Sequence, residues 1–240
     1  MRETIETNRD WLAHWTSVGQ RTPRDELYRQ VERTVGGKPV SPDEIELLTE
    51  AITQRLNLGR DDVLLDLCCG NGLITARLSP LCRAVVGADY TIELIQTARE
   101  RQPMPNTVYL HRAADDLHPT DFPVGPPTKV CMNGGLQYLT EALTKRVLRS
   151  LRALARQDLV IFFTDVPDAA KLDAFYNTPE RRAEFEWRRA AATEPMGTWW
   201  DRDHLRGLMQ SANYAASIIE PDPGRSTAHY RFDVLAHFVR

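Results

Sequence analysis

The sequence predicts an α/β fold, a mostly parallel sheet with helices on both faces, and two features predict it. From residue 63 onward, short apolar runs that suit strands buried on both faces alternate with stretches of helical periodicity. Strands that alternate with helices form a parallel sheet, because each helix crosses one face of that sheet. Residues 215–220 and 230–239 differ, because the Pro-Asp-Pro-Gly turn between them predicts a closing antiparallel pair.

Residues 1–60 are expected to form a helical N-terminal cap. Trp11, His14 and Trp15 are spaced to share one face of a helix. Residues 25–34 form a second amphipathic segment, which stops at a pair of glycines. Ser41, followed by a proline and two acidic residues, is a strong signal for the start of a helix that we expect to continue to residue 59.

Residues 61–240 are expected to form the core of one domain, since 240 residues with 42% hydrophobic and 26% charged content suit a single large domain. The predicted strands are residues 63–67, 84–88, 107–110, 130–132 and 159–164, and the predicted helices are residues 73–79, 92–101, 139–155 and 201–211. Residues 171–192 interrupt this order with a long helical pattern rich in arginine, glutamate and aromatic side chains. We expect residues 167–198 to form a helical insertion that roofs a substrate pocket.

Composition argues against several classes of function. The net charge is −3 and no basic stripe is present, so a nucleic-acid partner is not expected. No apolar run reaches the roughly 18 residues of a membrane span, and the first ten residues do not resemble a signal peptide. A cytoplasmic protein without a membrane partner is therefore expected. The cysteines lack the spacing of a zinc site, which predicts buried, reduced thiols and no metal centre.

The most informative segment is residues 66–72, Asp-Leu-Cys-Cys-Gly-Asn-Gly, between a predicted strand and a predicted helix. Its glycines allow a tight turn and close approach of a ligand, and the N–H groups at the start of the next helix suit an anionic group. Asp89 ends the following strand, where a carboxylate accepts hydrogen bonds from both hydroxyls of a ribose. The alternatives are a purely structural turn and a helix cap at Asp89.

Together these features resemble the class I S-adenosylmethionine-dependent methyltransferases, which have a Rossmann-like fold. The resemblance covers residues 58–164 and implies S-adenosyl-L-methionine as the cofactor. The turn lacks the first glycine of the dinucleotide fingerprint, which argues against a nicotinamide oxidoreductase. The implied contacts are Asp66 beside the cofactor amino group, Gly70 under its methionine portion, Cys68 and Cys69 along the turn, Asp89 at the ribose and Tyr90 beside adenine.

The aspartate that binds adenine in this family has no direct counterpart in the sequence. The resemblance places Ala113 at its position. The candidates left for this contact are Ala114, Asp115, Asp116 and backbone atoms. Residues 133–139 match the segment near the transferable methyl group, which implies that Asn133 contacts the cofactor and that the residues after it face the substrate.

Two residues are candidates for catalysis. Tyr138 stands where small-molecule methyltransferases often have a histidine, so its phenol is a candidate to orient the acceptor or remove a proton; packing at a helix start is the alternative. His14 belongs either to a lid that closes over the cofactor or to a helix packed on the sheet. Further candidate bases are His111, His204 and Tyr230. Weaker candidates for substrate contact are Trp11, Trp15, Gln137, Trp200 and His204.

The resemblance implies methyl transfer to an oxygen or nitrogen of a small molecule, such as a secondary metabolite or glycan precursor. The extra residues build a cap and an insertion, which suit a roofed pocket better than a nucleic-acid surface. The expected assembly is a monomer or a homodimer. Two alternatives stay open: methylation of RNA or protein, and a non-catalytic partner subunit that binds the cofactor, which the alanine at position 113 favours.

Overall fold

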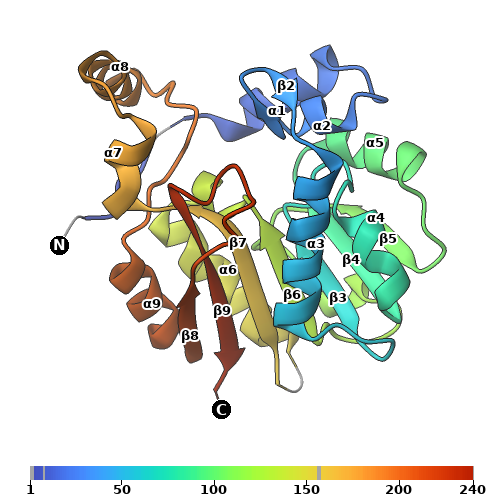
Figure 1. The fold of residues 1–240 in the computed structure, drawn as a ribbon. Helices are drawn as coiled ribbons and strands as arrows, with labels where there is room; N and C mark the ends of the chain where they lie inside the picture. Colours follow the sequence, from blue (N-terminus) through green and yellow to red (C-terminus); the bar gives the residue numbers. More distant parts are fainter. Residues whose placement is uncertain (1–2, 8, 156–157, 240) are drawn as a thin grey trace.

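The computed structural model describes residues 3–7, 9–155 and 158–239, and across them the main sheet has seven strands in the order β5-β4-β3-β6-β7-β9-β8 (Figure 1). The strands are β3 (Val63–Leu67), β4 (Ala84–Asp89), β5 (Thr107–His111), β6 (Lys129–Asn133), β7 (Val160–Pro167), β8 (Tyr214–Ile219) and β9 (Arg231–Phe238). β3 to β7 pair in parallel, whereas β9 is antiparallel to both β7 and β8. The predicted mostly parallel sheet with an antiparallel closing pair is confirmed.

Helices cover both faces of this sheet, which is why the strands are apolar runs rather than alternating ones. α3 (Pro42–Leu56), α4 (Thr75–Leu78) and α5 (Ile92–Arg101) cover one face, where Leu64 of β3 packs with α3 and α4. α6 (Glu141–Leu154) and α9 (Arg202–Ser211) cover the other, where Leu65 packs with α6. Short 3₁₀ helices occupy Ser79–Leu81, Pro119–Asp121, Leu136–Tyr138 and Ala169–Lys171.

The start of α3 follows the signal read from the sequence. The Ser41 hydroxyl accepts a hydrogen bond from the Glu44 amide at 3.2 Å, and Pro42 occupies the first turn. The helix ends at Asn57, which adopts a left-handed conformation with φ 48°. α3 lies within residues 1–60 and packs directly on the sheet, so its buried face contributes to the main core. The predicted boundaries of cap, core and insertion stay predictions.

The N-terminal segment lies above the carboxyl ends of the strands (Figure 1). α1 (Trp11–Arg21) begins at Asp10, whose carboxylate accepts from the Ala13 amide at 2.9 Å. α2 (Leu27–Gln30) is only one turn long, so the helix expected over residues 25–34 is much shorter than its pattern indicates. The chain leaves the helix because Glu32 turns left-handed, with φ 51°, and then forms a hairpin from β1 (Thr34–Val35) and β2 (Lys38–Pro39).

The long helical stretch expected over residues 171–192 is divided into α7 (Leu172–Phe175) and α8 (Pro179–Ala190). Thr178 precedes a proline and adopts an extended conformation, because the proline ring disfavours helical geometry in the residue before it. The Thr178 hydroxyl then caps α8 by accepting from the Arg181 amide at 3.3 Å. Both helices stand beside α1 at the end of the sheet where the strands terminate in carboxyl ends (Figure 1).

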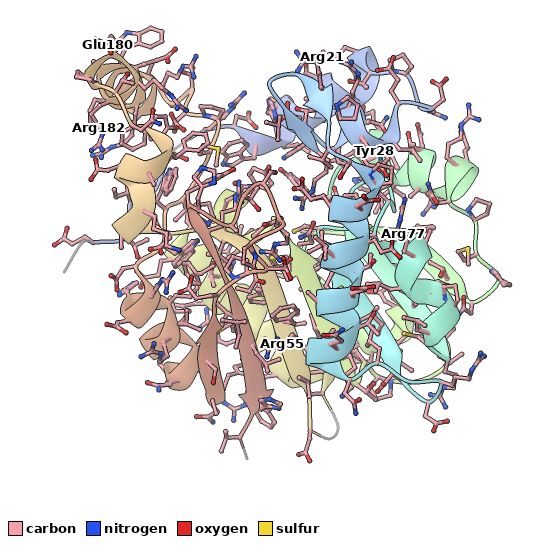
Figure 2. The ribbon with its side chains drawn as sticks, viewed as in Figure 1. Arg21, Tyr28, Arg55, Arg77, Glu180 and Arg182 are labelled. Atoms are coloured by element: carbon pink, nitrogen blue, oxygen red, sulfur yellow. The ribbon has the colours of Figure 1, made fainter. Side chains whose placement is uncertain are left out.

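The outer face of α8 is charged and mostly ion-paired. Figure 2 shows Glu180 and Arg182 at the margin of the molecule. Arg188 pairs with Glu184 at 2.7 Å and Arg182 pairs with Asp173.

Within the described part of the chain, no helix combines the length and the apolar character that a membrane crossing needs.

Substitution of Gly197 tests how tightly residues 167–198 are held against the segment after β6. Gly197 lies where these residues lead back to the sheet. Its φ is +71°, and a Cβ added there would clash with the main-chain carbonyl of Gln137. We expect Gly197→Ala to lower the free energy of unfolding by about 2–4 kcal/mol, because strain and overpacking act together. Urea denaturation followed by circular dichroism measures the change.

Gly207→Ala is the matched control. Gly207 lies in α9 with nothing within 4 Å of an added Cβ. Alanine there should raise the free energy of unfolding by about 0.5–1 kcal/mol, since glycine is a poor residue for a helix interior. Equal effects of the two substitutions would contradict the contact between residues 197 and 137.

Candidate functional site

A cavity of about 720 Å³ opens at the carboxyl ends of β3, β4 and β6. Its floor comes from the turn after β3 and the segment after β6. Its walls and roof come from residues 31–36, from α1 and the insertion, and from the loop before β9. The site residues predicted from sequence that line it are Trp11, Trp15, Asp66, Cys68, Cys69, Gly70, Asp89, Tyr90, Ala114, Asp115, Asn133, Gln137 and Tyr138.

The turn after β3 is tight and closely covered. Cys68 and Gly70 adopt left-handed conformations, with φ of 54° and 55°. A Cβ on Gly70 would lie 2.9 Å from Cγ1 of Val31, so only glycine leaves room beneath the N-terminal segment. Cys69 anchors the turn to the neighbouring strand by donating its amide to the Ala88 carbonyl at 3.1 Å.

Asp89 fastens this turn to the start of α5. Its Oδ2 accepts from the Gly70 amide at 3.0 Å, and its Oδ1 accepts from the amide of Thr91, which caps α5, at 2.8 Å. Burial raises the pKa of the carboxyl group. An ionised carboxylate offers about four acceptor positions, so two remain for a ligand in the cavity. The structural role of Asp89 therefore leaves acceptor positions free for a ligand.

Asp66 lies deeper, at 2% exposure. Thr75 donates its hydroxyl to Oδ2 at 2.6 Å, and the Cys131 thiol donates to Oδ1 at 3.4 Å. Burial raises the pKa of Asp66 to about 6. Burial also raises the pKa of the Cys69 and Cys131 thiols, so both stay protonated at neutral pH.

The cavity next to Tyr90 is lined by small and apolar side chains. Ala113, Ala114 and Leu94 border it there. Asp115 also lines the cavity, but its Oδ2 already accepts from Nε of Arg146 at 2.8 Å. Asp116, the other acidic candidate, lies 3.4 Å from His118 and is not among the cavity-lining residues.

The segment after β6 places amide and phenol groups beside the turn. Asn133 donates to the Thr164 hydroxyl at 2.6 Å and accepts from Arg33. Tyr138 packs between Trp11 and Trp15, with ring centroids 4.6 and 5.4 Å away. Burial raises the pKa of the Tyr138 phenol, so at neutral pH it donates a hydrogen bond and does not serve as a base.

A mostly buried group of charges, here called the arginine cluster, lies along β7 and β9, and two of its members, Arg33 and Arg231, line the cavity. Its members are Arg33, Arg225, Arg231, Asp165 and Asp233. Sequence reasoning missed all five. Charged residues at positions 231 and 233, inside an otherwise apolar strand, and an aspartate at the end of β7 were the available signals.

Asp165 is the centre of the arginine cluster. It lies at the β-bulge of β7, with φ 59° and 2% exposure. Arg33 donates to Oδ2 at 2.6 Å, Thr227 donates to Oδ1 at 2.8 Å, and Arg225 lies 3.4 Å from Oδ1. The guanidinium groups hold the pKa of Asp165 well below its usual range, even though burial acts in the opposite direction.

The candidate catalytic and substrate residues that lie outside the cavity lining are Trp200, His204, His14 and His111. Trp200 is fully buried and donates Nε1 to the Leu136 carbonyl at 3.2 Å, because a large indole in this apolar layer fills core space. His204 contacts Glu141 at 2.8 Å on the surface. His14 lies 2.7 Å from Arg9 and 3.3 Å from Glu32, and its ring packs against those of Trp11 and Trp15. Within the described residues, no cluster of side chains suited to a metal ion is found.

Comparison with known proteins gives both sequence and structural matches. Residues 64–158 match the family described as a methyltransferase domain. Chondramide synthase of Chondromyces crocatus is 28% identical over 208 residues, which is 84% of this chain and 5% of that protein. An uncharacterized methyltransferase of Schizosaccharomyces pombe is 49% identical over 53 residues, 22% of this chain and 20% of that protein. The chain thus spans a small part of these relatives.

Solved structures share the fold. Magnesium protoporphyrin IX methyltransferase from Synechocystis, with bound S-adenosylhomocysteine, has a TM-score of 0.62 at 12% identity and covers 95% of this chain and 98% of that one. A chain from the complex of the Haloferax volcanii Trm112 methyltransferase activator with a methyltransferase has a TM-score of 0.65 at 14% identity, covering 97% and 99%. The chain therefore has the Rossmann-like fold of these methyltransferase structures, and its residues 64–158 match a methyltransferase domain.

Proposed function

We propose that this chain transfers the methyl group to an oxygen or nitrogen of a small molecule, such as a secondary metabolite or glycan precursor. The observation that carries the proposal is the single cavity that contains both the turn after β3 and a separate polar region, under a roof of Trp11, Phe175 and Met196. Its volume of about 720 Å³ is within the range of small-molecule sites. We propose residues 1–60 as the cap and 167–198 as the roof.

The residues of the β3 turn fit the cofactor. Because residue 70 is glycine, space remains beneath the Val31 side chain. This space suits close approach of the methionine portion of the cofactor. The Asp89 carboxylate, with acceptor positions to spare, suits the two ribose hydroxyls, and Asp66 suits the ammonium group. Tyr90 and Ala114 provide an apolar border for adenine, and Cys68, Cys69 and Asn133 complete the proposed contacts.

The remaining residues would orient the acceptor and exclude water. When bound, the cofactor supplies a methyl group already activated on a sulfonium, so alignment and exclusion of water are the main tasks of the protein. Trp11 and Trp15 close over Tyr138, and the Tyr138 phenol is a hydrogen-bond donor toward the acceptor. Gln137, held by Gly134 at 2.9 Å, is a second polar contact.

Several relatives have names that refer to small molecules, which supports the proposal. Besides the chondramide synthase and the magnesium protoporphyrin enzyme, a probable cobalt-precorrin-6B methyltransferase of Methanocaldococcus jannaschii is 31% identical over 123 residues, 49% of this chain and 63% of that protein. A non-catalytic subunit that binds the cofactor and supports a partner is the second candidate, since one structural neighbour comes from a complex of a methyltransferase with its activator. Methylation of RNA or protein is the third.

Replacement of Asp89 tests the cofactor site. Loss of charge-assisted hydrogen bonds to the ribose should weaken S-adenosylmethionine binding by about 10–100-fold in Asp89→Ala. Calorimetric titration with S-adenosylmethionine, NAD and NADP measures this, and the wild type should bind only the first. Asp89→Asn tests the charge alone, since an amide oxygen still accepts from the turn.

Asp61→Ala is the control for this experiment, because Asp61 is exposed before β3 and should leave the affinity unchanged. Thermal melts establish that each variant is folded. Unchanged affinity in folded Asp89→Ala would remove the ribose assignment. Wild-type protein that binds S-adenosylmethionine only with a partner present would favour the second candidate.

The pH dependence of cofactor affinity tests Asp66. Its pKa in the folded protein is about 6, so it is ionised at pH 7 and increasingly protonated below pH 6. An ionised carboxylate attracts the cationic cofactor. Affinity should therefore fall as pH falls through 6, by up to about tenfold per pH unit, and Asp66→Asn should bind more weakly at pH 7 with a flatter profile.

A cofactor-free readout accompanies this test. Because the folded pKa lies above the value of 3.8 for an unperturbed aspartate, ionisation of Asp66 costs stability as pH rises from about 4 to about 6. The melting temperature of Asp66→Asn relative to wild type should therefore be higher at pH 7 than at pH 4. A constant difference would contradict the raised pKa, whether or not cofactor binds.

A further inference from the structure

The arginine cluster contains one more positive than negative side chain. Three arginines face two aspartates. Asp233 accepts hydrogen bonds from Arg225 at 2.9 and 3.0 Å, and Asp165 accepts from Arg33 at 2.6 Å. Each carboxylate is therefore matched by one guanidinium, and Arg231 is the cation left over.

Arg231 has only neutral acceptors. Within the described residues it forms no ion pair, and its guanidinium donates to the main-chain oxygen of Asp165 and to Oε1 of Gln137, the latter at 3.0 Å. The residue is 7% exposed. Buried charges in proteins are normally paired, because an unpaired ion loses its hydration without compensation. The Asp165 carboxylate interacts electrostatically with Arg231, and the Tyr230 ring centroid lies 5.2 Å from its guanidinium carbon, but no carboxylate among the described residues pairs with Arg231 directly. An anion in the cavity would give Arg231 a direct partner.

The unused donors of Arg231 belong to a residue that lines the cavity. A guanidinium has five N–H donors in a planar fork. Nη1 and Nη2 each make one of the hydrogen bonds above, and Nε has no acceptor among the described residues. The Asp165 and Gln137 oxygens fix the fork on two sides, which orders it for a planar carboxylate.

The surroundings of Arg231 indicate what kind of anion fits. Gln137 joins Arg231 to the Gly134 carbonyl, so the guanidinium lies next to the segment after β6. The same cavity is also lined by the apolar side chains of Trp11, Phe175 and Met196, and by Arg181, whose guanidinium carbon lies 5.1 Å from the Phe175 ring centroid. A ligand that satisfies both regions has a negative end and an apolar body.

We infer that the methyl acceptor is an organic carboxylate whose anion binds Arg231 and whose apolar body lies under Trp11, Phe175 and Met196. The inference deepens the proposed function, on which it rests for the identity of the ligand as the acceptor. Arg231 would recognise the carboxylate of such an acceptor. A neutral sugar or an amine has no anion for Arg231 to bind.

Ligand-observed NMR titration of three small probes tests the charge requirement. Phenylacetate is the carboxylate, phenylacetamide has nearly the same shape without charge, and phenyl phosphate is a different oxyanion. Each is titrated with and without saturating S-adenosylhomocysteine. We expect phenylacetate to bind at least about tenfold more tightly than phenylacetamide, and more tightly than phenyl phosphate.

Substitution of Arg231 tests the residue. Arg231→Met should abolish the preference for phenylacetate over phenylacetamide, and Arg231→Lys should keep part of it, since the charge remains without the fork. Arg149→Gln on the exposed face of α6 is the matched control and should behave as wild type. If Arg231→Met does not fold, the wild-type selectivity and Arg231→Lys decide.

Three outcomes would overturn the inference. The wild-type protein binds phenylacetate and phenylacetamide equally well, or binds neither. It prefers phenyl phosphate, or folded Arg231→Met keeps the preference for phenylacetate. Failure of the proposed function looks different. Protein that prefers phenylacetate but does not bind S-adenosylhomocysteine would refute the cofactor site and leave the carboxylate site standing. Protein that binds S-adenosylhomocysteine without carboxylate selectivity would do the reverse.

Discussion

The buried carboxylate of Asp165 is the constraint on which the arrangement around the cavity depends. At 2% exposure it must be paired, and its partners come from three separate stretches of chain. Arg33 belongs to the N-terminal segment, Asn133 ends β6, and Arg225 and Thr227 belong to the loop before β9. Removing one partner would leave a buried charge uncompensated. The ion pair between Arg33 and Asp165 therefore holds the N-terminal segment against the sheet more firmly than the packing contacts of that segment alone would.

This attachment explains why the cavity is covered. The residue two positions before Arg33 is Val31, whose side chain lies over Gly70 at the turn after β3. The same segment is thus fixed at β7 through Arg33 and lies above the turn after β3, the proposed cofactor site, through Val31. α1 continues the cover on the other side, where Trp11 and Trp15 enclose Tyr138. Exclusion of water from a methyl-transfer site requires a cover of this kind, because the core sheet leaves the carboxyl ends of its strands open.

Sequence reasoning succeeded where the signal was local. The apolar runs predicted the strands, and the spacing of Asp66, Gly70 and Asp89 predicted residues that do line one cavity. It failed over residues 25–34 and 171–192, where periodicity was helical but Glu32 turns left-handed and the extended Thr178 separates α7 from α8. The arginine cluster was missed because Arg33 and Asp165 are 132 positions apart, and no local pattern reports such a pairing. Trp200 and His204 were selected by residue type. Residue type alone does not tell whether a side chain lies in the core, on the surface or in the cavity.

Cys68 shows how the two halves of the site are packed into one unit. A non-glycine residue in the left-handed region costs about 1 kcal/mol, and family resemblance places small residues at this turn. The cost is offset by contact, since the Cys68 side chain fills the space beside Gly135. A Cβ at position 135 would lie 2.8 Å from Cβ and 2.9 Å from Sγ of Cys68. The side chain therefore restricts the segment after β6 to glycine at its nearest point and limits how closely that segment approaches the turn after β3. Because methyl transfer depends on alignment more than on proton transfer, a fixed distance between these two segments is what the fold must provide.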